Sequence, residues 1–358
     1  MGTLRERVDF LSLLVSKGGG DWRKSRPVVF EWRPNAGETP PWKFSVGKKS
    51  DFSDARVEYL DSDVHTNAAG IVSYELPRAN FEIATRYYWR VTCNLSRKKE
   101  SHGALCNCKD CLNVKECQVA SFFVEDLAPR WIALEGRVGN VRDLGGRKTI
   151  NGRRVRQGLV FRGQGLNDNS AGGIRSGRNR LMVEDVNYLT KTLKIKTDLD
   201  LRSSGETAYA TNSPLGNAVC YVQNSSLDYD GIFKREGMEA MARNFRVFCS
   251  ETNYPVYFHC IAGADRTGAL AYVLNGVLGV SRREVETDWE STFYPDIPGG
   301  REGPEGIRVW NSEWHLTEGF EKYGTRKDPL SRKIELYLRD CGIKKEEVVR
   351  FKSIMIAE

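Results

Sequence analysis

The pattern of apolar residues along the chain changes near residues 125–131, and this change limits the folds that the chain can adopt. Residues 26–125 contain short runs of β-branched and aromatic residues, separated by turn-forming stretches such as PNAGETPP. From residue 127 onward, short apolar runs alternate with stretches of helical periodicity. Regularly spaced strands predict a β-sandwich, whereas strands that alternate with helices predict a parallel sheet covered by helices. The sequence therefore predicts two domains of different fold class.

We expect a tail at residues 1–21, an all-β sandwich at 22–126 and an α/β domain with a central parallel sheet at 127–358. A chain of 358 residues is long enough to bury two hydrophobic cores. The predicted strands of the sandwich are the segments 26–32, 42–47, 70–76, 86–92 and 118–124. In the second domain we expect strands within 196–204 and 254–260, and helices within 186–195, 238–252, 267–279, 281–293, 329–342 and 344–357.

The charge balance narrows the class of partner. Lysine and arginine outnumber aspartate and glutamate by 54 to 47, a net charge of +7 that suits an anionic substrate such as a phosphate ester. We find no block of like charges that would indicate a nucleic-acid partner, and no apolar run long enough for a membrane span. The first residues show no signal-peptide pattern. The expected location is cytoplasmic if the sequence is complete, and exported if a leader was removed.

The stretch VYFHCIAGADRTG, at residues 256–268, carries the strongest indication of chemistry. Its apolar start predicts a strand that delivers His259 and Cys260 at its carboxyl end, and a helix is expected from Thr267. Open α/β sheets bind ligands at such a strand–loop–helix crevice. The loop amides and the N-terminus of the helix favour an anion there.

The residues of this loop suit a phosphate group. The backbone amides from Ile261 onward can point inward, and the small residues Ala262, Gly263 and Ala264 leave room for a tetrahedral anion. Arg266 can bind two phosphate oxygens with its planar guanidinium group, a geometry that lysine cannot copy. The sequence therefore predicts a cradle for phosphate.

Cys260 is the predicted nucleophile at the floor of this cradle, because the positive field favours its thiolate form. Attack on phosphorus leaves a cysteinyl-phosphate. We expect Thr267 to hydrogen-bond the sulfur and ease its departure in the second step. His259 is expected to orient the loop, because a thiolate needs no general base. Catalysis on this scheme uses no cofactor.

The pattern His-Cys-x5-Arg-Thr-Gly, here HCIAGADRTG, resembles the signature of the protein tyrosine phosphatase superfamily. Three more segments resemble elements of its bacterial branch: NVRDLGG, VRQGLVFRGQGL and LDLRSSGE. The resemblance extends over roughly residues 130–358 and implies the cysteine-dependent phosphatase fold and activity. In the first half, RYYWRVT resembles the penultimate strand of a fibronectin type III-like domain.

Two arginines in the matching segments, Arg162 and Arg202, are candidates either for binding substrate or for fastening loops around the sheet. Two positions depart from the relatives. Gly163 stands where the bacterial branch often has serine, and Ala264 stands where lipid-active relatives often have lysine. The missing cation weakens an assignment to phosphoinositides.

The general acid has three candidates. Ester cleavage expels an alkoxide or phenoxide, which needs a proton. Superfamily enzymes commonly use an aspartate about thirty residues before the nucleophile, and Asp228 and Asp230 lie 32 and 30 residues before Cys260. Asp265, inside the loop, is the rival, because the bacterial branch often has an aspartate there.

Two segments remain with open alternatives. Cys106, Cys108, Cys111 and Cys117 fall between two predicted strands of the sandwich, and they can hold a structural zinc ion, form two disulfides or stay free thiols. Residues 295–326 are expected to form an inserted loop, rich in arginine and tryptophan, which either covers the site as a lid or packs on the surface.

The sequence thus predicts a phosphatase acting on phosphate monoesters, with a phosphotyrosine protein or dual-specificity substrate. One alternative keeps the chemistry but changes the substrate to inositol phosphates or phosphoinositides. The other is a catalytically inactive module that binds phosphate. The expected partners are a phosphorylated protein or a small phosphate ester at the site, and a protein or a carbohydrate at the sandwich.

Overall fold

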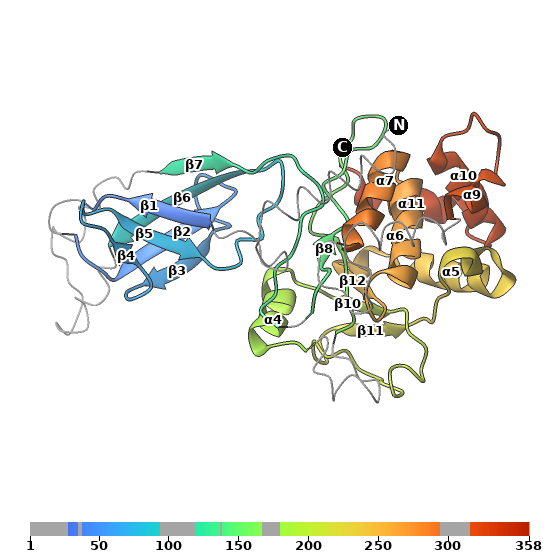
Figure 1. Cartoon of the computed structure of the whole chain (residues 1–358), viewed down its shortest axis with the longest axis horizontal. Helices are drawn as coiled ribbons and strands as arrows, with labels where there is room; N and C mark the ends of the chain where they lie inside the picture. Colours follow the sequence, from blue (N-terminus) through green and yellow to red (C-terminus); the bar gives the residue numbers. More distant parts are fainter. Residues whose placement is uncertain are drawn as a thin grey trace. The chain divides into compact units, whose positions relative to one another are not determined.

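The chain divides into two compact units, Arg26–Leu127 and a unit that contains Ala128–Glu358. The structure is a computed structural model that describes residues 28–34, 38–93, 119–136, 138–166, 180–293 and 316–357. Figure 1 shows a first unit built from strands and a second unit in which helices surround a sheet. The predicted tail at residues 1–21 lies outside the described residues.

Two antiparallel sheets make up the described part of the first unit. Their strand orders are β1-β5-β4 and β3-β2-β6-β7. The five predicted strands are present, and β3 and β4 are additional, because their charged and polar residues obscure the strand pattern. The strands are β1 (Val28–Trp32), β2 (Trp42–Gly47), β3 (Arg56–Leu60), β4 (His65–Thr66), β5 (Val72–Leu76), β6 (Arg86–Cys93) and β7 (Ala120–Phe123).

Aromatic rings fill the core of this unit. The ring of Phe30 on β1 lies 4.8 Å from that of Phe44 on β2 and 5.1 Å from that of Trp89 on β6, measured between centroids. Tyr74 on β5 lies 5.3 Å from Phe44. Tilted and edge-on pairs of this kind stabilise a core beyond the burial of their apolar area. The first unit therefore has a hydrophobic core of its own.

The sheet of the second unit has the strand order β11-β10-β12-β9-β8. The first four strands in this order run parallel, and β8 pairs antiparallel with β9 at the edge. Every residue of β9, β10 and β12 is buried, as expected for parallel strands covered on both faces. The strands are β8 (Arg142–Asp143), β9 (Val160–Gly163), β10 (Thr197–Asp200), β11 (Cys220–Gln223) and β12 (Val256–His259).

Helices are present in all six segments where the sequence predicts them. The segment 295–326 is not entirely a loop, because Leu316 and Phe320 give its last part a buried helical face. None of the helices within the described ranges is long and apolar enough to cross a lipid bilayer. The α-helices are α4 (Val183–Asn187), α5 (Arg235–Val247), α6 (Asp265–Val277), α7 (Arg282–Glu290), α9 (Leu316–Glu321), α10 (Leu330–Asp340) and α11 (Lys345–Met355). Single helical turns are η2 (Tyr188–Thr192), η3 (Tyr229–Phe233), η4 (Glu251–Asn253) and η5 (Ser291–Phe293).

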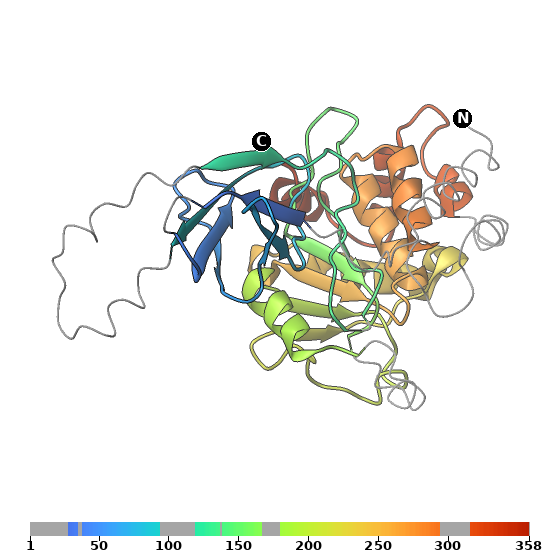
Figure 2. The ribbon, with the colours of Figure 1, turned by 60° about the vertical axis from the view of Figure 1, so that its left-hand side comes forward.

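Alternate residues of the parallel strands enter two separate cores, one on each face of the sheet. On β12, Val256 and Phe258 belong to the core formed with α5, α6, α10 and α11, whereas Tyr257 belongs to the core formed with η2. On β9, Val160 and Phe161 divide in the same way. Figures 1 and 2 show α4 on one side of the sheet and α5 and α6 on the other.

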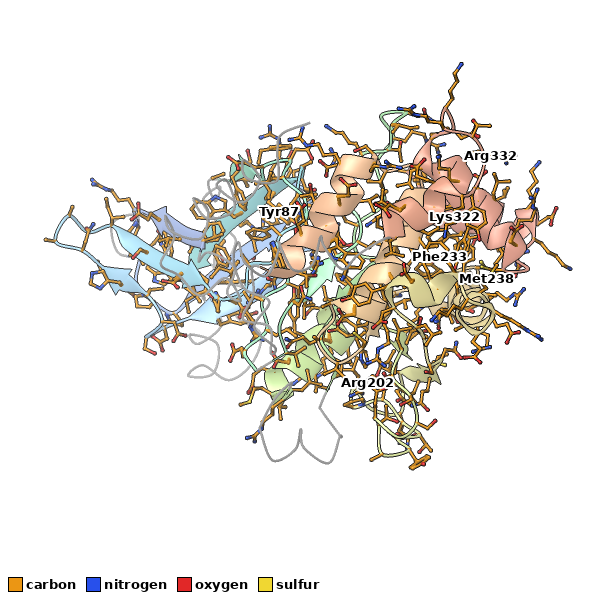
Figure 3. All side chains as sticks on the ribbon, turned by 45° about the vertical axis from the view of Figure 1, so that its right-hand side comes forward. Tyr87, Arg202, Phe233, Met238, Lys322 and Arg332 are labelled. Atoms are coloured by element: carbon orange, nitrogen blue, oxygen red, sulfur yellow. The ribbon has the colours of Figure 1, made fainter. Side chains whose placement is uncertain are left out.

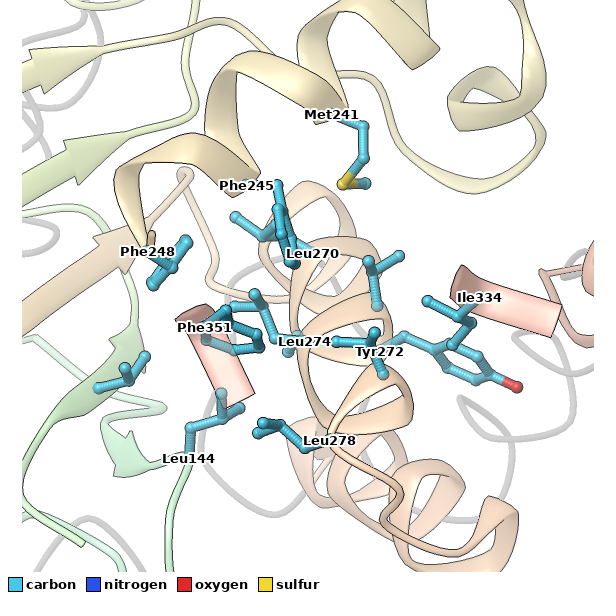
Figure 4. Packing of buried hydrophobic residues seen from close by; sticks show 14 of the residues in the cluster. Leu144, Met241, Phe245, Phe248, Leu270, Tyr272, Leu274, Leu278, Ile334 and Phe351 are labelled. Carbon is cyan, nitrogen blue, oxygen red and sulfur yellow. The ribbon is translucent and has the colours of Figure 1, made fainter. Parts of the chain in front are cut away.

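Helix α6 is the centre of the larger core. Its residues 267–277 are all buried, which explains the nearly unbroken apolar sequence of this segment. Figure 4 shows Leu274 of α6 close to Phe351 of α11, with Phe245 of α5 above them. The fully buried Phe351 ring lies 5.2 Å from the ring of Phe245 and 6.2 Å from that of Phe248. Helix α11 is thereby packed against α5 and α6.

Replacing Phe351 by alanine should lower the free energy of unfolding of the second unit by about 3–5 kcal/mol, because it removes a buried ring and leaves a cavity. Urea unfolding of the full chain measures the loss. Val349 lies on the same helix but is 56% exposed, so Val349→Ala is the matched control and should change stability by less than about 0.5 kcal/mol. Equal losses in the two variants would contradict this packing of α11.

Candidate active site

The carboxyl ends of the parallel strands meet at one edge of the sheet. His259, the last residue of β12, is in register with Gly163 on β9 and with Asp200 on β10. Cys260 follows directly and is 2% exposed, and α6 begins five residues later at Asp265. The predicted strand–loop–helix arrangement is therefore present, with the predicted nucleophile at the point where the strand ends.

The loop after Cys260 is held by its carbonyl oxygens. The side-chain amide of Asn140 donates hydrogen bonds to the carbonyls of Ala262 (3.2 Å) and Gly263 (3.0 Å). The guanidinium group of Arg162 also donates to the Gly263 carbonyl, at 2.8 Å. In a planar trans peptide the N–H of the next residue points away from the carbonyl. The anchored carbonyls therefore turn the following amides to the opposite side of the loop, where they are available to an anion.

Glycine is required at position 263 for two reasons. Its φ is +67°, a left-handed conformation that glycine adopts without strain. A Cβ atom there would also lie 2.3 Å from the carbonyl oxygen of Gly163, so no larger residue fits against the end of β9. A further bond joins the two strands' ends, because the amide of Gly165 donates to the carbonyl of Ile261 at 3.0 Å.

A single carboxylate of α7, Asp288, holds three buried arginines behind the loop. Its Oδ1 lies 3.1 Å from Arg142 Nε and 3.1 Å from Arg147 Nη2, and its Oδ2 lies 2.6 Å from Arg162 Nη1. Burial alone would raise the pKa of Asp288, but the three guanidinium groups outweigh it and hold that pKa well below its usual value. Burial and the charge of Arg162 lower the pKa of Arg142 to about 9.

Asp288 and Arg147 were not among the predicted site residues. The signal in the sequence was the position of Asp288 on the same helical stripe as Val285 and Trp289, both of which are buried. A charged residue on an apolar stripe is buried and must find partners. The identity of those partners depends on the tertiary structure, so the helical period alone did not give it.

His259 contacts the backbone of the loop and two carboxylates. Its Nδ1 lies 3.1 Å from the Cys260 carbonyl oxygen, and its Nε2 lies 2.9 Å from Asp198 Oδ1. Burial would lower the pKa of His259, but Asp200 and Asp198 outweigh this effect and raise it. An imidazole held in this way suits a residue that orients the loop.

Arg266 forms a two-pronged ion pair with Glu206, which follows β10. Its Nη1 and Nη2 each lie 2.8 Å from a carboxylate oxygen of Glu206. The hydrogen bonds from Arg266 lower the pKa of Glu206 to about 2. Glu206 was not predicted as a site residue, although it stands in the LDLRSSGE segment that resembles the bacterial branch. These bonds fix the plane of the guanidinium group.

Arg202 lies at the carboxyl end of β10 (Figure 3) and is almost fully buried. It forms an ion pair with Asp200, with Nη2 2.7 Å from Oδ2 and Nε 2.9 Å from Oδ1. The hydroxyl of Tyr221 donates to the same carboxylate at 3.0 Å. Arg162 is likewise buried, in its pair with Asp288. Both arginines therefore support the frame of the site, and direct contact of either with substrate stays a prediction.

The three candidate acids have different surroundings. Asp228 is half-buried and directly precedes η3, whereas Asp230, within η3, is exposed. Asp265 opens α6, and the hydroxyl of Tyr229 donates a hydrogen bond to its carboxylate. Burial would lower the pKa of Arg266, but the neighbouring Glu206 and Cys260 outweigh this effect and raise it. The charge of Asp228 adds to this increase. Asp228 is thus partly shielded from water, and its charge acts on Arg266.

Three further predictions are not tested by the described residues. The Thr267 hydroxyl is buried and makes no hydrogen bond to the residues that the structure describes, so its bond to the Cys260 sulfur stays a prediction. The four cysteines Cys106, Cys108, Cys111 and Cys117 lie outside the described residues. Residues 295–315 of the predicted inserted loop lie outside them as well.

Replacing Asp288 by asparagine should destabilise the second unit by about 3–5 kcal/mol, because it leaves buried guanidinium groups without their shared carboxylate. The pKa of Asp288 is depressed in the folded state, so its contribution is present above its ordinary value of 3.8 and is lost as the pH falls. The stability difference between wild type and variant should therefore be largest near neutral pH and narrow below about pH 4. Denaturant unfolding between pH 3 and pH 7 measures it.

Glu284→Gln is the matched control for this experiment. Glu284 forms an ion pair with Arg147, at 2.9 Å, and its side chain is 44% exposed. Because Glu284 is half-exposed and Arg147 keeps Asp288 as a partner, losing this pair should cost less, about 0–1 kcal/mol. Similar losses in the two variants would mean that Asp288 does not hold the arginines together.

Comparison with known proteins adds evidence of a different kind. Residues 132–295 match the tyrosine phosphatase family. A protein of Cupriavidus necator, named as a candidate tyrosine-protein phosphatase, is 27% identical over 191 residues, which cover 44% of this chain and 64% of that protein. This chain therefore spans somewhat less than two thirds of the relative's length.

Two solved structures have a weaker likeness. The core catalytic domain of the PP-IP phosphatase SIW14 from S. cerevisiae is 13% identical, with a TM-score of 0.28, over 46% of this chain and 87% of that chain. TpbA of P. aeruginosa is 14% identical, with a TM-score of 0.27, over 56% and 89% respectively. Because these scores are low, the description of the fold is based on the strand order and packing of this chain alone. Over residues 132–295 the second unit is thus similar in sequence to tyrosine phosphatases, and the curated relative is similar in the same way.

Proposed function

We propose that the second unit hydrolyses phosphate monoesters through a cysteinyl-phosphate intermediate. The observation that carries this proposal is the position of Cys260, at the end of β12 and directly before a loop whose carbonyls are held outward. Outward carbonyls leave the amides of the loop and the N-terminus of α6 to bind the phosphate oxygens. The match to the tyrosine phosphatase family supports the same chemistry.

Arg266 has donors to spare for the substrate. Its guanidinium group carries five N–H groups, and Glu206 takes one from Nη1 and one from Nη2. The second Nη1 hydrogen faces the Leu201 carbonyl at 3.4 Å. Among the described residues no acceptor binds Nε–H or the second Nη2–H, and these two donors lie side by side on one edge of the group. We propose that this edge binds two phosphate oxygens, while Glu206 holds the adjacent edge formed by Nη1 and Nη2.

The reaction proceeds in two steps on this proposal. The Cys260 thiolate attacks phosphorus, the bond from phosphorus to the leaving oxygen breaks, and Asp228 gives its proton to that oxygen. Asp228 then takes a proton from water, whose oxygen attacks phosphorus, and the phosphorus–sulfur bond breaks to restore the thiolate. Phosphate and an alcohol or phenol are the products, and no cofactor is consumed.

The proposed substrate is a phosphotyrosine protein or a dual-specificity substrate. Inositol phosphates and phosphoinositides are the second candidate, which is favoured by the name of one structural relative and disfavoured by Ala264, where lipid-active relatives often have lysine. A phosphate-binding module without turnover is the third. A panel of phosphotyrosine peptides, phosphoinositides and inositol phosphates, assayed for phosphate release, distinguishes the three.

We propose a fibronectin type III-like identity for the first unit. The orders β1-β5-β4 and β3-β2-β6-β7 match the way that strands are shared between the two sheets of immunoglobulin-type sandwiches. Tyr87 on β6, labelled in Figure 3, accepts a hydrogen bond from the amide of Glu82 at 3.1 Å, which resembles the tyrosine corner of such domains. A protein or a carbohydrate is the proposed partner. The cysteine segment between β6 and β7 is proposed to hold zinc or two disulfides.

Replacing Cys260 by serine should abolish turnover while vanadate or phosphate still binds, because the loop and Arg266 are unchanged and only the nucleophile is lost. Phosphate release from an aryl phosphate measures turnover, and calorimetry measures the binding. Cys249→Ser is the matched control, because Cys249 is also buried but lies at the end of α5 and bonds the carbonyl of Phe245. Turnover by the Cys260→Ser variant would rule out the covalent mechanism.

Replacing Asp228 by asparagine should slow hydrolysis of phenyl phosphate roughly a hundredfold, and that of p-nitrophenyl phosphate much less, because only the poorer leaving group needs a proton. The alkaline limb of the pH–rate profile for phenyl phosphate should disappear. Asp230→Asn, at the exposed neighbour, is the control and should leave the ratio of the two rates unchanged. If Asp265→Asn alone gives the leaving-group dependence, the acid lies instead in the phosphate loop, by which we mean residues 260–266.

A further inference from the structure

The single turn η3, directly after Asp228, has an unusual backbone. Tyr229, its first residue, has a φ of +46°, in the left-handed region that bulky residues rarely occupy. Such a conformation costs of order 1–3 kcal/mol and persists only where the surroundings hold it. The side chain of Tyr229 identifies those surroundings.

Tyr229 contacts two elements of the candidate site. Its hydroxyl donates a hydrogen bond to the carboxylate of Asp265, in the first turn of α6. Its ring lies 6.2 Å from the ring of Trp289 on α7, measured between centroids. The acid-bearing segment is thus joined through one side chain to the helix that begins in the phosphate loop.

The rest of η3 is held independently. The amide of Gly231 donates to the Asp228 carbonyl at 2.8 Å, which closes the turn immediately after the proposed acid. The hydroxyl of Tyr337 on α10 donates to the Ile232 carbonyl at 2.8 Å, from the core side of the turn. One tyrosine therefore ties η3 to the core, and the other ties it to the phosphate loop.

We propose that Tyr229 is a positioning residue, which sets the place of Asp228 over the phosphate loop by binding Asp265. The proposal rests on the proposed phosphatase activity and adds a role for Asp265 as the anchor of the acid segment. A misplacement of about 1 Å in a reacting group can cost a hundredfold in rate, so the anchor matters for proton donation. It does not matter for the attack of the thiolate, because the described bonds that hold the carbonyls of the loop come from Asn140, Arg162 and Gly165.

Tyr229→Phe tests this proposal, because it removes the hydroxyl and keeps the ring beside Trp289. The rate for phenyl phosphate should fall tenfold or more, while the rate for p-nitrophenyl phosphate changes by less than about threefold. The alkaline limb of the pH–rate profile should flatten for the poorer leaving group alone. Binding of vanadate should stay within about threefold of wild type, since the phosphate loop is untouched.

Tyr337→Phe is the matched control. It removes the other tyrosine hydroxyl that contacts η3, without touching Asp265, and should leave the ratio of the two rates unchanged. An equal fall in the ratio of the phenyl phosphate rate to the p-nitrophenyl phosphate rate in both variants would show that Tyr229 acts only by stabilising the turn. This result would overturn the proposal.

Substitutions of Asp265 test the anchor from the other side. Asp265→Ala removes the acceptor of the phenol and should reproduce the leaving-group dependence of Tyr229→Phe. Asp265→Asn keeps an acceptor oxygen for the phenol and should leave the ratio of the two rates unchanged. The double variant Tyr229→Phe/Asp265→Ala should change the ratio of the two rates no more than either single variant does, because both substitutions break the same interaction. Additive losses would overturn the proposal.

Two different results separate the phosphatase activity from the positioning role of Tyr229. Absence of any Cys260-dependent phosphate release from wild type would overturn the phosphatase activity and the positioning role together. Normal turnover with an unchanged rate ratio in Tyr229→Phe would overturn the positioning role and leave the activity standing.

Discussion

The contact of Asp288 with three buried arginines is the interaction on which the rest of the candidate site depends. Arg162 is one of the three, and it also donates to the Gly263 carbonyl. Arg142 is another, and it bonds both the backbone and the side chain of Asn140, which in turn holds the loop. The shape of the loop therefore depends on one carboxylate of α7, which acts through Arg162 directly and through Arg142 by way of Asn140. Breaking a buried pair of this kind is costly because it leaves a charge without compensation.

A second set of ion pairs borders the same loop at the ends of β10 and β12. Asp200 forms an ion pair with Arg202. Burial would raise the pKa of Asp200, but His259 and Arg202 outweigh this effect and lower it to about 2. Glu206 binds Arg266 across the loop. Most of the charged side chains around Cys260 thus have protein partners already. Such preorganised groups need little rearrangement when charge develops in a reaction.

Much of the fold could be predicted from the sequence, because its strands and helices differ in period and composition. The apolar run before His259 and the small residues after it gave the strand, the loop and the start of α6. The pattern did not reveal Asp288 or Glu206, because an ion pair joins residues far apart in the chain and leaves no local period. Nor did it choose among the three aspartates, since their difference lies in burial and in the contact of Tyr229 with Asp265. The strands β3 and β4 were missed because polar residues on an exposed edge weaken the alternation.

The arginines behind the loop also have a consequence for selectivity. Arg142, Arg147 and Arg162 bring three positive charges into the interior, and Asp288 returns one negative charge, with half-exposed Glu284 as the other partner. Within this cluster the positive charges outnumber the negative ones, and the field of the cluster acts on an anion in proportion to the anion's own charge. A phosphate monoester carries close to two negative charges above its second pKa of about 6, whereas a sulfate monoester of the same shape carries one. On the proposed function, we therefore expect the site to bind a phosphate monoester more tightly than a sulfate monoester of the same shape.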